Sequence, residues 1–506
     1  MPQLLRVLLN MVHGAVEAFC LLSKGEEMKA SAVNENNNID SNISNIKENK
    51  PQESESVPIH PLTGLGNACR FIELHGENIY YEIKFKRFFV WTGKNWTQAT
   101  NAELLTMAVE VIEHLYDETS IIGACHIKTG TSITRGEILG HCEATSSLGK
   151  ITAMINLAKS FPEIRVKLSE FDNHPMLLNC NNGIIDLKTG ELRDHDKKYM
   201  ITKCIDVNYN PEAECPRWER FISEIMCNEP DMIDYIHRLL GYAITGDTSE
   251  QGVYIFNGNG SNGKSTLIRA LTHVMGDYVR HTPASTLLTK QINHIPADVA
   301  RLAGARIVFA MEVGSQNRMD ESLVKQLTGG DVISARKLYE NFIEFIPQLK
   351  LILASNYLPE VKGMDDGIWR RITPIPFNAK FTGASREGKL IELLKKESEG
   401  ILAWLVKGSR EWATRKLTCP IRVDQALSQY RESMDDLANF VEDRCKIGVG
   451  RRIELAELYD AYKIWCLSNS QEPIGKKGFG VMMRQRDYMQ VKTGSARYWA
   501  GINLNT

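Results

Sequence analysis

The residues most able to do chemistry form a run of glycines and small polar residues that ends in lysine and serine. The run follows an apolar segment, 253–256, and precedes the apolar start of a helix. Glycines let the backbone curl so that successive N–H groups point inward at phosphate oxygens, and the helix adds its positive end. The spacing Gly-x-x-x-x-Gly-Lys-Ser, between a strand and a helix, predicts a phosphate-binding loop. Its candidate nucleotide-binding residues are Gly258, Asn259, Gly260, Ser261, Asn262, Gly263, Lys264, Ser265 and Thr266.

The two residues that end the run have separate expected roles. Lys264 can reach the β- and γ-phosphates of a nucleotide, and the hydroxyl of Ser265 can hold Mg²⁺. The sequence therefore predicts ATP and Mg²⁺ as the cofactors.

Two polar residues end buried-strand patterns further along the chain. The segment 305–313 (ARIVFAMEV) contains Glu312 near its end, and the segment 351–356 ends in Asn356. In phosphate-loop ATPases, a carboxylate in such a position polarises the attacking water. An amide there can hold the γ-phosphate or that water without adding charge. We therefore predict that Glu312 and Asn356 are catalytic; the alternative is that they merely end strands.

Basic residues follow in two further places. Arg370 and Arg371 come after a turn, and burying both without acceptors would be costly, so we expect one to reach the γ-phosphate of a neighbouring subunit. The segment 331–345 alternates in strand fashion around Arg336 and Lys337. This pattern predicts a hairpin whose tip contacts DNA phosphates. In both places the alternative is a solvated surface.

These candidates need a scaffold. Between 252 and about 378, strand patterns alternate with helical ones, which predicts an α/β core with a parallel sheet. Two short helices are expected over 216–246, as a helical collar ahead of that core. A hairpin around Gly93 and a small β-unit around Asn182 are expected further upstream. We predict a leader and disordered linker (1–57), an α+β domain (58–205), an ATPase domain (206–430) and a C-terminal domain (431–506).

The C-terminal segment is basic. From Cys445 onward it holds ten basic and five acidic residues, although the whole chain has a net charge of -2. Helical patterns over 453–468 and 476–486, followed by a β-like tail, predict a winged helix. A winged helix that serves protein interaction is the alternative. The candidate DNA contacts are Lys476, Lys477, Arg484 and Arg486.

Bulk features exclude several classes of protein. The 11 cysteines include no C-x-x-C pair, which argues for a reducing cytosol and against a structural zinc site. No apolar run reaches about 18 residues, so no membrane association is expected. The first 25 residues are mildly apolar but are interrupted by Arg6, His13 and Glu17, which disfavours a secretory signal. A short amphipathic helix there, or a start at Met28, remains open.

The order of these elements resembles the superfamily 3 helicases, which are AAA+ ring ATPases of viruses, phages and plasmids. It is most similar to the helicase part of the phage/plasmid primase–helicase family, poxvirus-type members included. The resemblance covers roughly 63–440. It lies in TGLGNACRFIELHG (63–76), LLNCNNGIIDLKTGEL (177–192), LLGYAITGDTSEQ (239–251), the phosphate loop, ARLAGARIVFAMEV (300–313), LTGGDVISARKLY (327–339), ASNYLPEVKGMDDGIWRRITPIPF (354–377) and GILAWLVKGSREW (400–412).

The resemblance implies roles for individual residues. It places Lys264 and Ser265 at the phosphate and Mg²⁺ positions, Glu312 at the catalytic acid, Asn356 at sensor 1, Arg370 or Arg371 at the arginine finger and Lys337 near the basic residue of the pore hairpin. Two features depart from the family pattern. Met311 precedes Glu312 where many AAA+ proteins have a second acidic residue. In addition, only about 60 residues precede the matching region, so primer synthesis has no evident place in this sequence.

We therefore predict an ATP-dependent replicative DNA helicase of a phage, prophage or plasmid, acting in the cytoplasm of a bacterial host. The resemblance implies a homo-oligomeric ring, with a hexamer expected, that moves 3′ to 5′ on single-stranded and forked DNA. A separate primase is a possible partner. Two alternatives stay open: an origin-binding or loader ATPase that unwinds little, and a DNA-triggered scaffold or defence ATPase.

Overall fold

The computed structural model describes residues 57–289, 297–311, 318–336, 342–363, 365–382, 389–469, 471–494 and 496–505. The predicted leader and linker lie outside the described residues, except for Val57. No helix in the described ranges combines the length and the apolar character that crossing a bilayer requires.

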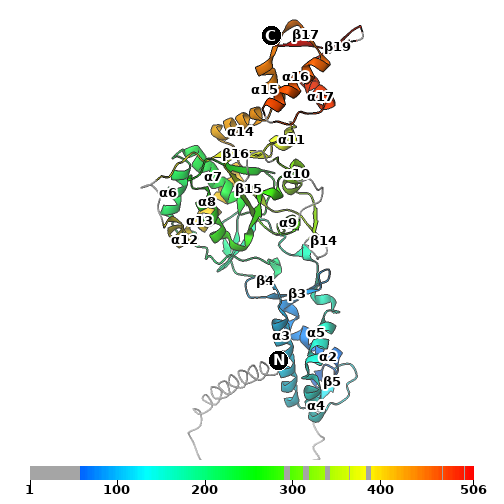
Figure 1. Cartoon of the computed structure of the whole chain (residues 1–506). Helices are drawn as coiled ribbons and strands as arrows, with labels where there is room; N and C mark the ends of the chain where they lie inside the picture. Colours follow the sequence, from blue (N-terminus) through cyan, green and yellow to red (C-terminus); the bar gives the residue numbers. More distant parts are fainter. Residues whose placement is uncertain are drawn as a thin grey trace, which may run out of the picture. The chain divides into compact units, whose positions relative to one another are not determined.

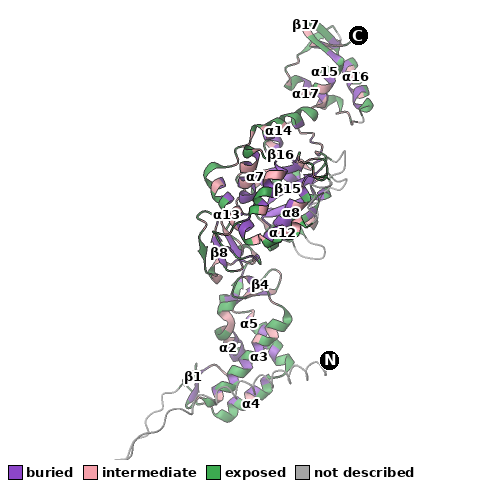
Figure 2. Ribbon diagram, turned by 90° about the vertical axis from the view of Figure 1, so that its left-hand side faces the viewer, coloured by how far each residue is buried: buried purple, intermediate pink, exposed green. Residues whose placement is uncertain are grey.

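A five-stranded parallel sheet is formed by strands between residues 253 and 376 (Figure 1). Its strand order is β11-β12-β15-β10-β16, and each neighbouring pair runs parallel. The inner strands β10, β12 and β15 are almost wholly buried, as expected for apolar runs that are covered on both faces, whereas the edge strand β11 is partly exposed (Figure 2). The predicted α/β fold with a parallel sheet is thus confirmed. The strands are β10 (Val253–Asn257), β11 (Val279–Pro283), β12 (Ile307–Met311), β15 (Lys350–Ser355) and β16 (Ile372–Pro376).

The helices that pack against this sheet come from segments before, within and after its strands in the sequence. The two helices expected over 216–246 are present, and each begins with proline at its first position, where no N–H bond is lost. Gly241 in the second of them faces Gly408, so closely that a Cβ on Gly241 would lie 2.1 Å from the Gly408 carbonyl carbon. Glycine therefore lets these two helices approach backbone to backbone. The helices are α6 (Pro216–Ile225), α7 (Pro230–Ala243), α8 (Lys264–Met275), α12 (Leu390–Lys396), α13 (Ser398–Arg415) and α14 (Ile421–Ser433).

The segment 57–171 forms its own sheet and helices. The segment predicted as a hairpin folds as three antiparallel strands, with β6 (Arg165–Val166) added in parallel to the first. Capping boxes at Thr100 and Thr134 begin two of the helices, and a buried ion pair joins Arg70 Nη2 to Glu118 Oε2 at 2.6 Å. The elements are β2 (Ile79–Glu82), β3 (Arg87–Trp91), β4 (Trp96–Gln98), α2 (Gly64–His75), α3 (Asn101–Asp117), α4 (Arg135–Thr145) and α5 (Leu148–Ala158).

The predicted small β-unit is also present, as β7 (Leu177–Cys180), β8 (Gly183–Asp186) and β9 (Leu192–Arg193). Leu178 and Ile185 of this unit belong to the same apolar cluster as Trp218 of α6. The apolar cluster therefore crosses the domain boundary expected near residue 205, and the division into domains stays a prediction.

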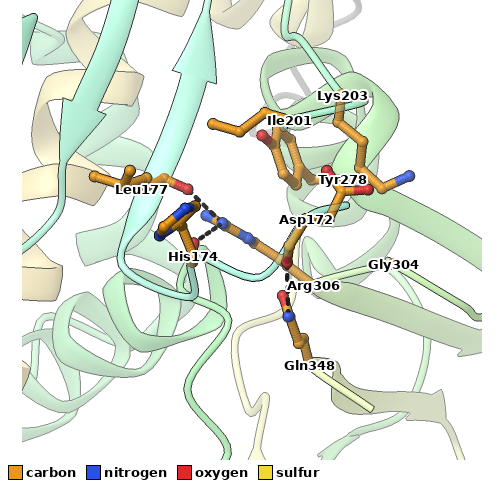
Figure 3. Close-up of a pocket in the computed structure, with 9 residues that line it drawn as sticks. All are labelled: Asp172, His174, Leu177, Ile201, Lys203, Tyr278, Gly304, Arg306 and Gln348. Atoms are coloured by element: carbon orange, nitrogen blue, oxygen red, sulfur yellow. Dashed lines mark hydrogen bonds between the residues drawn. The ribbon is translucent and has the colours of Figure 1, made fainter. Parts of the chain in front are cut away.

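Two buried cations lie at the N-terminal ends of neighbouring strands of the central sheet. Arg306 precedes β12 and donates to the carbonyls of Ile244 (2.8 Å), His174 (3.3 Å) and Leu177, and its guanidinium lies 4.6 Å from the Tyr278 ring (Figure 3). Lys350 begins β15 and donates to carbonyls that follow α7. Both cations thus bind carbonyls at or just beyond the C-terminus of α7, where the helix macrodipole favours positive charge.

The segment 436–505 has a core of its own around Phe440, Tyr462 and Trp499. Both predicted helices and the β-tail are present. A further strand, β17, was not predicted, because its sequence CKIGVGRRIE lacks the alternation of apolar and polar residues typical of a strand. Most of its residues are exposed in the structure. The sheet order is β17-β19-β18. The elements are α15 (Asp436–Arg444), β17 (Cys445–Glu454), α16 (Leu455–Ser468), α17 (Lys476–Gln485), β18 (Gln490–Thr493) and β19 (Ala496–Leu504).

Asp436 in the first turn of α15 gives this segment a pH-dependent stability. Burial and then the nearby Glu360 raise the pKa of Asp436 to about 6. The folded chain therefore binds this proton more tightly than the unfolded chain, and the associated stability is lost as the pH rises through 6. We expect Asp436→Asn to gain about 1–2 kcal/mol in unfolding free energy near pH 7.5 and only a small fraction of that near pH 4. Urea denaturation at both pH values, with Glu442→Gln as control, measures this; an equal change at both values would contradict it.

Candidate nucleotide-binding site

The predicted phosphate loop joins the C-terminal end of β10 to the N-terminus of α8. Gly258 has φ +155°, and a Cβ there would lie 2.2 Å from the carbonyl oxygen of Phe377. Gly263, with φ +89°, precedes α8 and provides no side chain to cap it. The first N–H groups of this 12-residue helix therefore have no capping side chain and can bind an anion.

Lys264 lies within this loop and is 7% exposed. Its Nζ donates to the carbonyl of Gly258 and lies 3.4 Å from Oδ1 of Asn356. No carboxylate pairs with Lys264 among the described residues, and burial lowers the pKa of its ammonium group. A buried cation without a counter-ion favours a bound anion. The side chains of Lys264 and Asn356 are therefore neighbours in the structure, although the two residues are 92 positions apart in the sequence.

The order of strands in the sheet explains why Lys264 and Asn356 lie close together. β15 lies beside β10, with Ser355 paired in register with Asn257. Asn356, the next residue, is exposed at the edge of the sheet where the loop begins. Glu312 directly follows β12 on the other side of β15, but it lies outside the described residues, so its catalytic role stays a prediction.

The residues that follow β16 hold the phosphate loop in place, a role that was not predicted from the sequence. Directly after β16, the N–H of Phe377 donates to Asn257 (2.6 Å), and its carbonyl accepts from Nδ2 of Asn262 (3.1 Å). The N–H of Phe381 donates to the carbonyl of Ser261 at 2.8 Å. Asn262 is buried, and its side-chain amide stabilises the loop through this hydrogen bond to Phe377.

The two adjacent arginines have different surroundings, although their sequence pattern predicts one shared role. Arg371 is 8% exposed and donates to the carbonyl of Gly367 within its own turn. Arg370 is exposed, and Nη2 of each arginine lies near Oε1 of Gln251, at 3.2 Å for Arg370 and 3.3 Å for Arg371. Arg370 is therefore the arginine that another molecule can contact.

The basic hairpin predicted after residue 331 is present as β13 (Ile333–Arg336) and β14 (Phe342–Phe345), an antiparallel pair. Arg336 is exposed, and its guanidinium lies 5.7 Å from the ring of its cross-strand partner Phe342, which is 55% exposed. Phe342 was not predicted from the sequence, although its place opposite Arg336 could have indicated it. Lys337 lies outside the described residues, so its DNA contact stays a prediction.

In the C-terminal segment, the structure separates one predicted DNA contact from the others. Lys476, Lys477 and Arg484 on α17 are exposed. Arg486, by contrast, is half-buried, and its Nη2 lies 2.5 Å from both carboxylate oxygens of Asp435. This ion pair holds the C-terminal end of α17 to the N-terminus of α15, so Arg486 is already paired within its own chain, and its DNA contact stays a prediction.

No group of three or more His, Cys, Asp or Glu side chains is arranged to hold a metal ion within the described ranges. Ser265, the predicted Mg²⁺ ligand, is exposed beside Lys264, and its role stays a prediction.

Two family models match the chain. Residues 68–227 match a family described as D5 N terminal like, and residues 256–371 match a family of unknown function (DUF5906). The second match runs from the phosphate-loop strand to the arginine pair.

Several viral proteins are similar to this chain. One from Acanthamoeba polyphaga mimivirus, provisionally named as a helicase, is 30% identical over 326 residues, which cover 60% of this chain and 34% of the relative. A provisionally named helicase of Invertebrate iridescent virus 3 is 25% identical over 62% of this chain and 38% of the relative. A provisionally named primase of African swine fever virus is 24% identical over 60% and 34%. The chain thus spans about a third of the length of these curated relatives.

Among solved structures, the apo A form of the NrS-1 C-terminal region aligns with 85% of this chain and 98% of its own, with a TM-score of 0.49 and 11% identity. Taken together, the sequence matches relate this chain to proteins of large DNA viruses that carry helicase and primase names.

Proposed function

We propose that this protein is an ATP-dependent DNA helicase of the superfamily 3 type, built on an AAA+ core. The meeting of Lys264 and Asn356 at the phosphate loop, on the C-terminal edge of a parallel sheet, carries the proposal. Ligands of open α/β sheets bind outside the carboxyl ends of the strands, beside the point where the strand order reverses. The loop strand β10 lies between β15 and β16 in that sheet, as this rule requires.

The residues present fit ATP and Mg²⁺. Gly258 allows close approach, α8 offers free N–H groups, and Lys264 is a buried cation without a carboxylate partner in the described ranges. Bound ATP supplies the terminal phosphoryl group that water attacks. In this proposal Lys264 binds the β- and γ-phosphates, Ser265 holds Mg²⁺ and Asn356 orients the water that Glu312 activates.

The exposed Arg370 supports a ring. Arg371 donates to a backbone carbonyl of its own turn, whereas Arg370 donates to no backbone carbonyl of the described residues. Arg370 can therefore complete the site of a neighbouring subunit. We infer a closed homo-oligomer in which each subunit supplies one arginine to the next site, with six subunits expected.

Two surfaces support DNA binding in this proposal. Arg336 and the exposed ring of Phe342 offer a cation and a stacking face on one hairpin. In the C-terminal segment, the element order α15-β17-α16-α17-β18-β19 and the sheet order β17-β19-β18 support the assignment of a winged helix, which stays a proposal. The exposed Lys476, Lys477 and Arg484 lie on its second long helix, which is where such domains contact DNA.

The names of the relatives support a role in viral-type DNA replication. Because one relative carries a primase name, we propose that primer synthesis accompanies unwinding, in another protein or in another segment of the same polypeptide. The expected bacterial host and the direction of movement stay predictions.

Strand separation on a forked DNA with ATP and Mg²⁺ tests this function. We expect the wild-type protein to release the labelled strand, faster when the free single strand ends 3′, and to release nothing with a non-hydrolysable analogue. ATP hydrolysis that leaves the duplex intact would instead favour the loader or scaffold alternative. Absence of ATP hydrolysis with and without DNA would overturn the proposal.

A further inference from the structure

One end of the four-stranded sheet β4-β3-β2-β6 is strongly basic. Its strands β2 and β6 run parallel and pair Glu82 with Val166, so the turn after β2 lies beside the end of β6. Lys159, which directly follows α5, adds a cation here, because its carbonyl accepts from the Nε of Arg165 at 3.1 Å. We call these residues the basic end of the sheet: Lys84, Lys86, Arg87, Lys159, Arg165 and Lys167.

These six cations lack acidic partners. None of them forms an ion pair with any carboxylate in the described ranges, whereas nearby Lys197 pairs with Glu77 at 2.8 Å. The segments 82–87 and 159–167 contain six cations and two carboxylates, Glu82 and Glu163. Glu82 is buried and accepts the backbone N–H groups of the turn at 3.0 and 2.8 Å. The basic end is therefore positively charged as a whole.

Phe85 connects the basic end to the hairpin β13–β14. The guanidinium of Arg87 lies 5.0 Å from the Phe85 ring, and the Nζ of Lys84 lies 6.0 Å from it. The same ring packs against an apolar cluster that includes Ile333 and Ile343 of the hairpin. One cluster thus supports both the basic end and the hairpin that carries Arg336.

We propose that the basic end of the sheet is a second contact for the sugar–phosphate backbone of single-stranded DNA, in addition to the hairpin. This inference rests on the proposed function. Unpaired cations bind phosphates through release of counterions, without regard to base sequence. Ile83 is the single large apolar side chain exposed within the segments 82–87 and 159–167, so the surface suits a polyanion better than an apolar protein partner.

A variant with the four most exposed cations replaced tests the inference: Lys84→Gln, Lys86→Gln, Arg165→Gln and Lys167→Gln. Arg87 and Lys159 stay, because they are partly buried and each lies against two aromatic rings. We expect the affinity for a fluorescent oligothymidine to fall by about 10- to 100-fold at low salt. The slope of log affinity against log salt should become shallower by about 0.7 for each phosphate that the variant no longer neutralises. ATP hydrolysis without DNA should stay unchanged.

A control variant removes the same charge elsewhere, with Lys188→Gln, Arg193→Gln, Lys197→Gln and Lys198→Gln. The inference is supported if the control keeps wild-type affinity and slope while the first variant shows the weaker affinity and the shallower slope. It is overturned if the two variants behave alike while the wild-type protein and ATP hydrolysis remain normal. A wild-type protein that binds no oligothymidine would instead overturn the proposed function as well.

Discussion

Replacing Lys264 with alanine should abolish ATP turnover while leaving the fold intact. The ammonium group is buried, lies beside Asn356 and has no carboxylate partner in the part of the chain that the structure describes, so the fold does not depend on its charge. Removing a phosphate-binding cation costs most of the stabilisation of the charge that develops on the phosphate during hydrolysis. We expect the rate of hydrolysis to fall at least about a thousandfold.

The thermal unfolding of the Lys264→Ala variant separates this effect from misfolding. Burial lowers the pKa of Lys264, so keeping this group charged at neutral pH destabilises the folded protein, and its removal should not lower the melting temperature. Lys395→Ala, at an exposed lysine paired with Glu392, serves as the control and should hydrolyse ATP normally. Near-normal hydrolysis by the Lys264→Ala variant would refute the nucleotide site.

Replacing Arg370 with alanine should lower ATP turnover almost as much, but only in the assembled protein. An arginine that reaches a transferring phosphoryl group from a neighbouring subunit contributes about 10³- to 10⁵-fold to the rate. Because Arg370 is exposed in its own chain, its loss should not weaken ATP binding or folding. Arg193→Ala removes an exposed arginine whose ion pairs lie within the β8–β9 hairpin, and it should change neither property.

Mixing inactive protomers tests whether Arg370 acts across the interface. Lys264→Ala protomers have an intact arginine, and Arg370→Ala protomers have an intact phosphate loop. In a random ring about a quarter of the interfaces would combine the two intact parts, so hydrolysis should recover in part. No recovery, in rings shown by mass measurement to contain both variants, would count against an arginine supplied in trans. Full turnover by a solitary wild-type molecule would contradict it outright.

The features that sequence predicted well are local ones. The phosphate loop depends on residues 258–266 and their flanking strand and helix, so spacing alone defines it. The parallel sheet follows from alternating apolar runs, and the collar helices follow from apolar periodicity and an initial proline.

The features that sequence missed depend on distant partners. The support of the loop by Phe377 joins residues 115 positions apart, and nothing near Asn262 announces it. Arg371 and Arg486 look like free cations in sequence, yet each is held by its own chain, the first by a carbonyl and the second by Asp435. Side-chain placement of this kind follows from tertiary packing, which local patterns do not encode. Glu312 and Lys337 remain predictions.

The strand β16 has one consequence for how the subunits would work together. It begins directly after Arg371, whose carbonyl accepts from Val253 at 2.7 Å, and it ends directly before Phe377, which grips the loop. A single short strand thus connects the turn that carries Arg370, the arginine proposed to reach a neighbouring site, with the residue that holds the phosphate loop of its own subunit. In the proposed ring, a shift of the loop on nucleotide binding would be transmitted through β16 towards Arg370 and the adjoining site, so we expect the sites to hydrolyse ATP in sequence rather than independently.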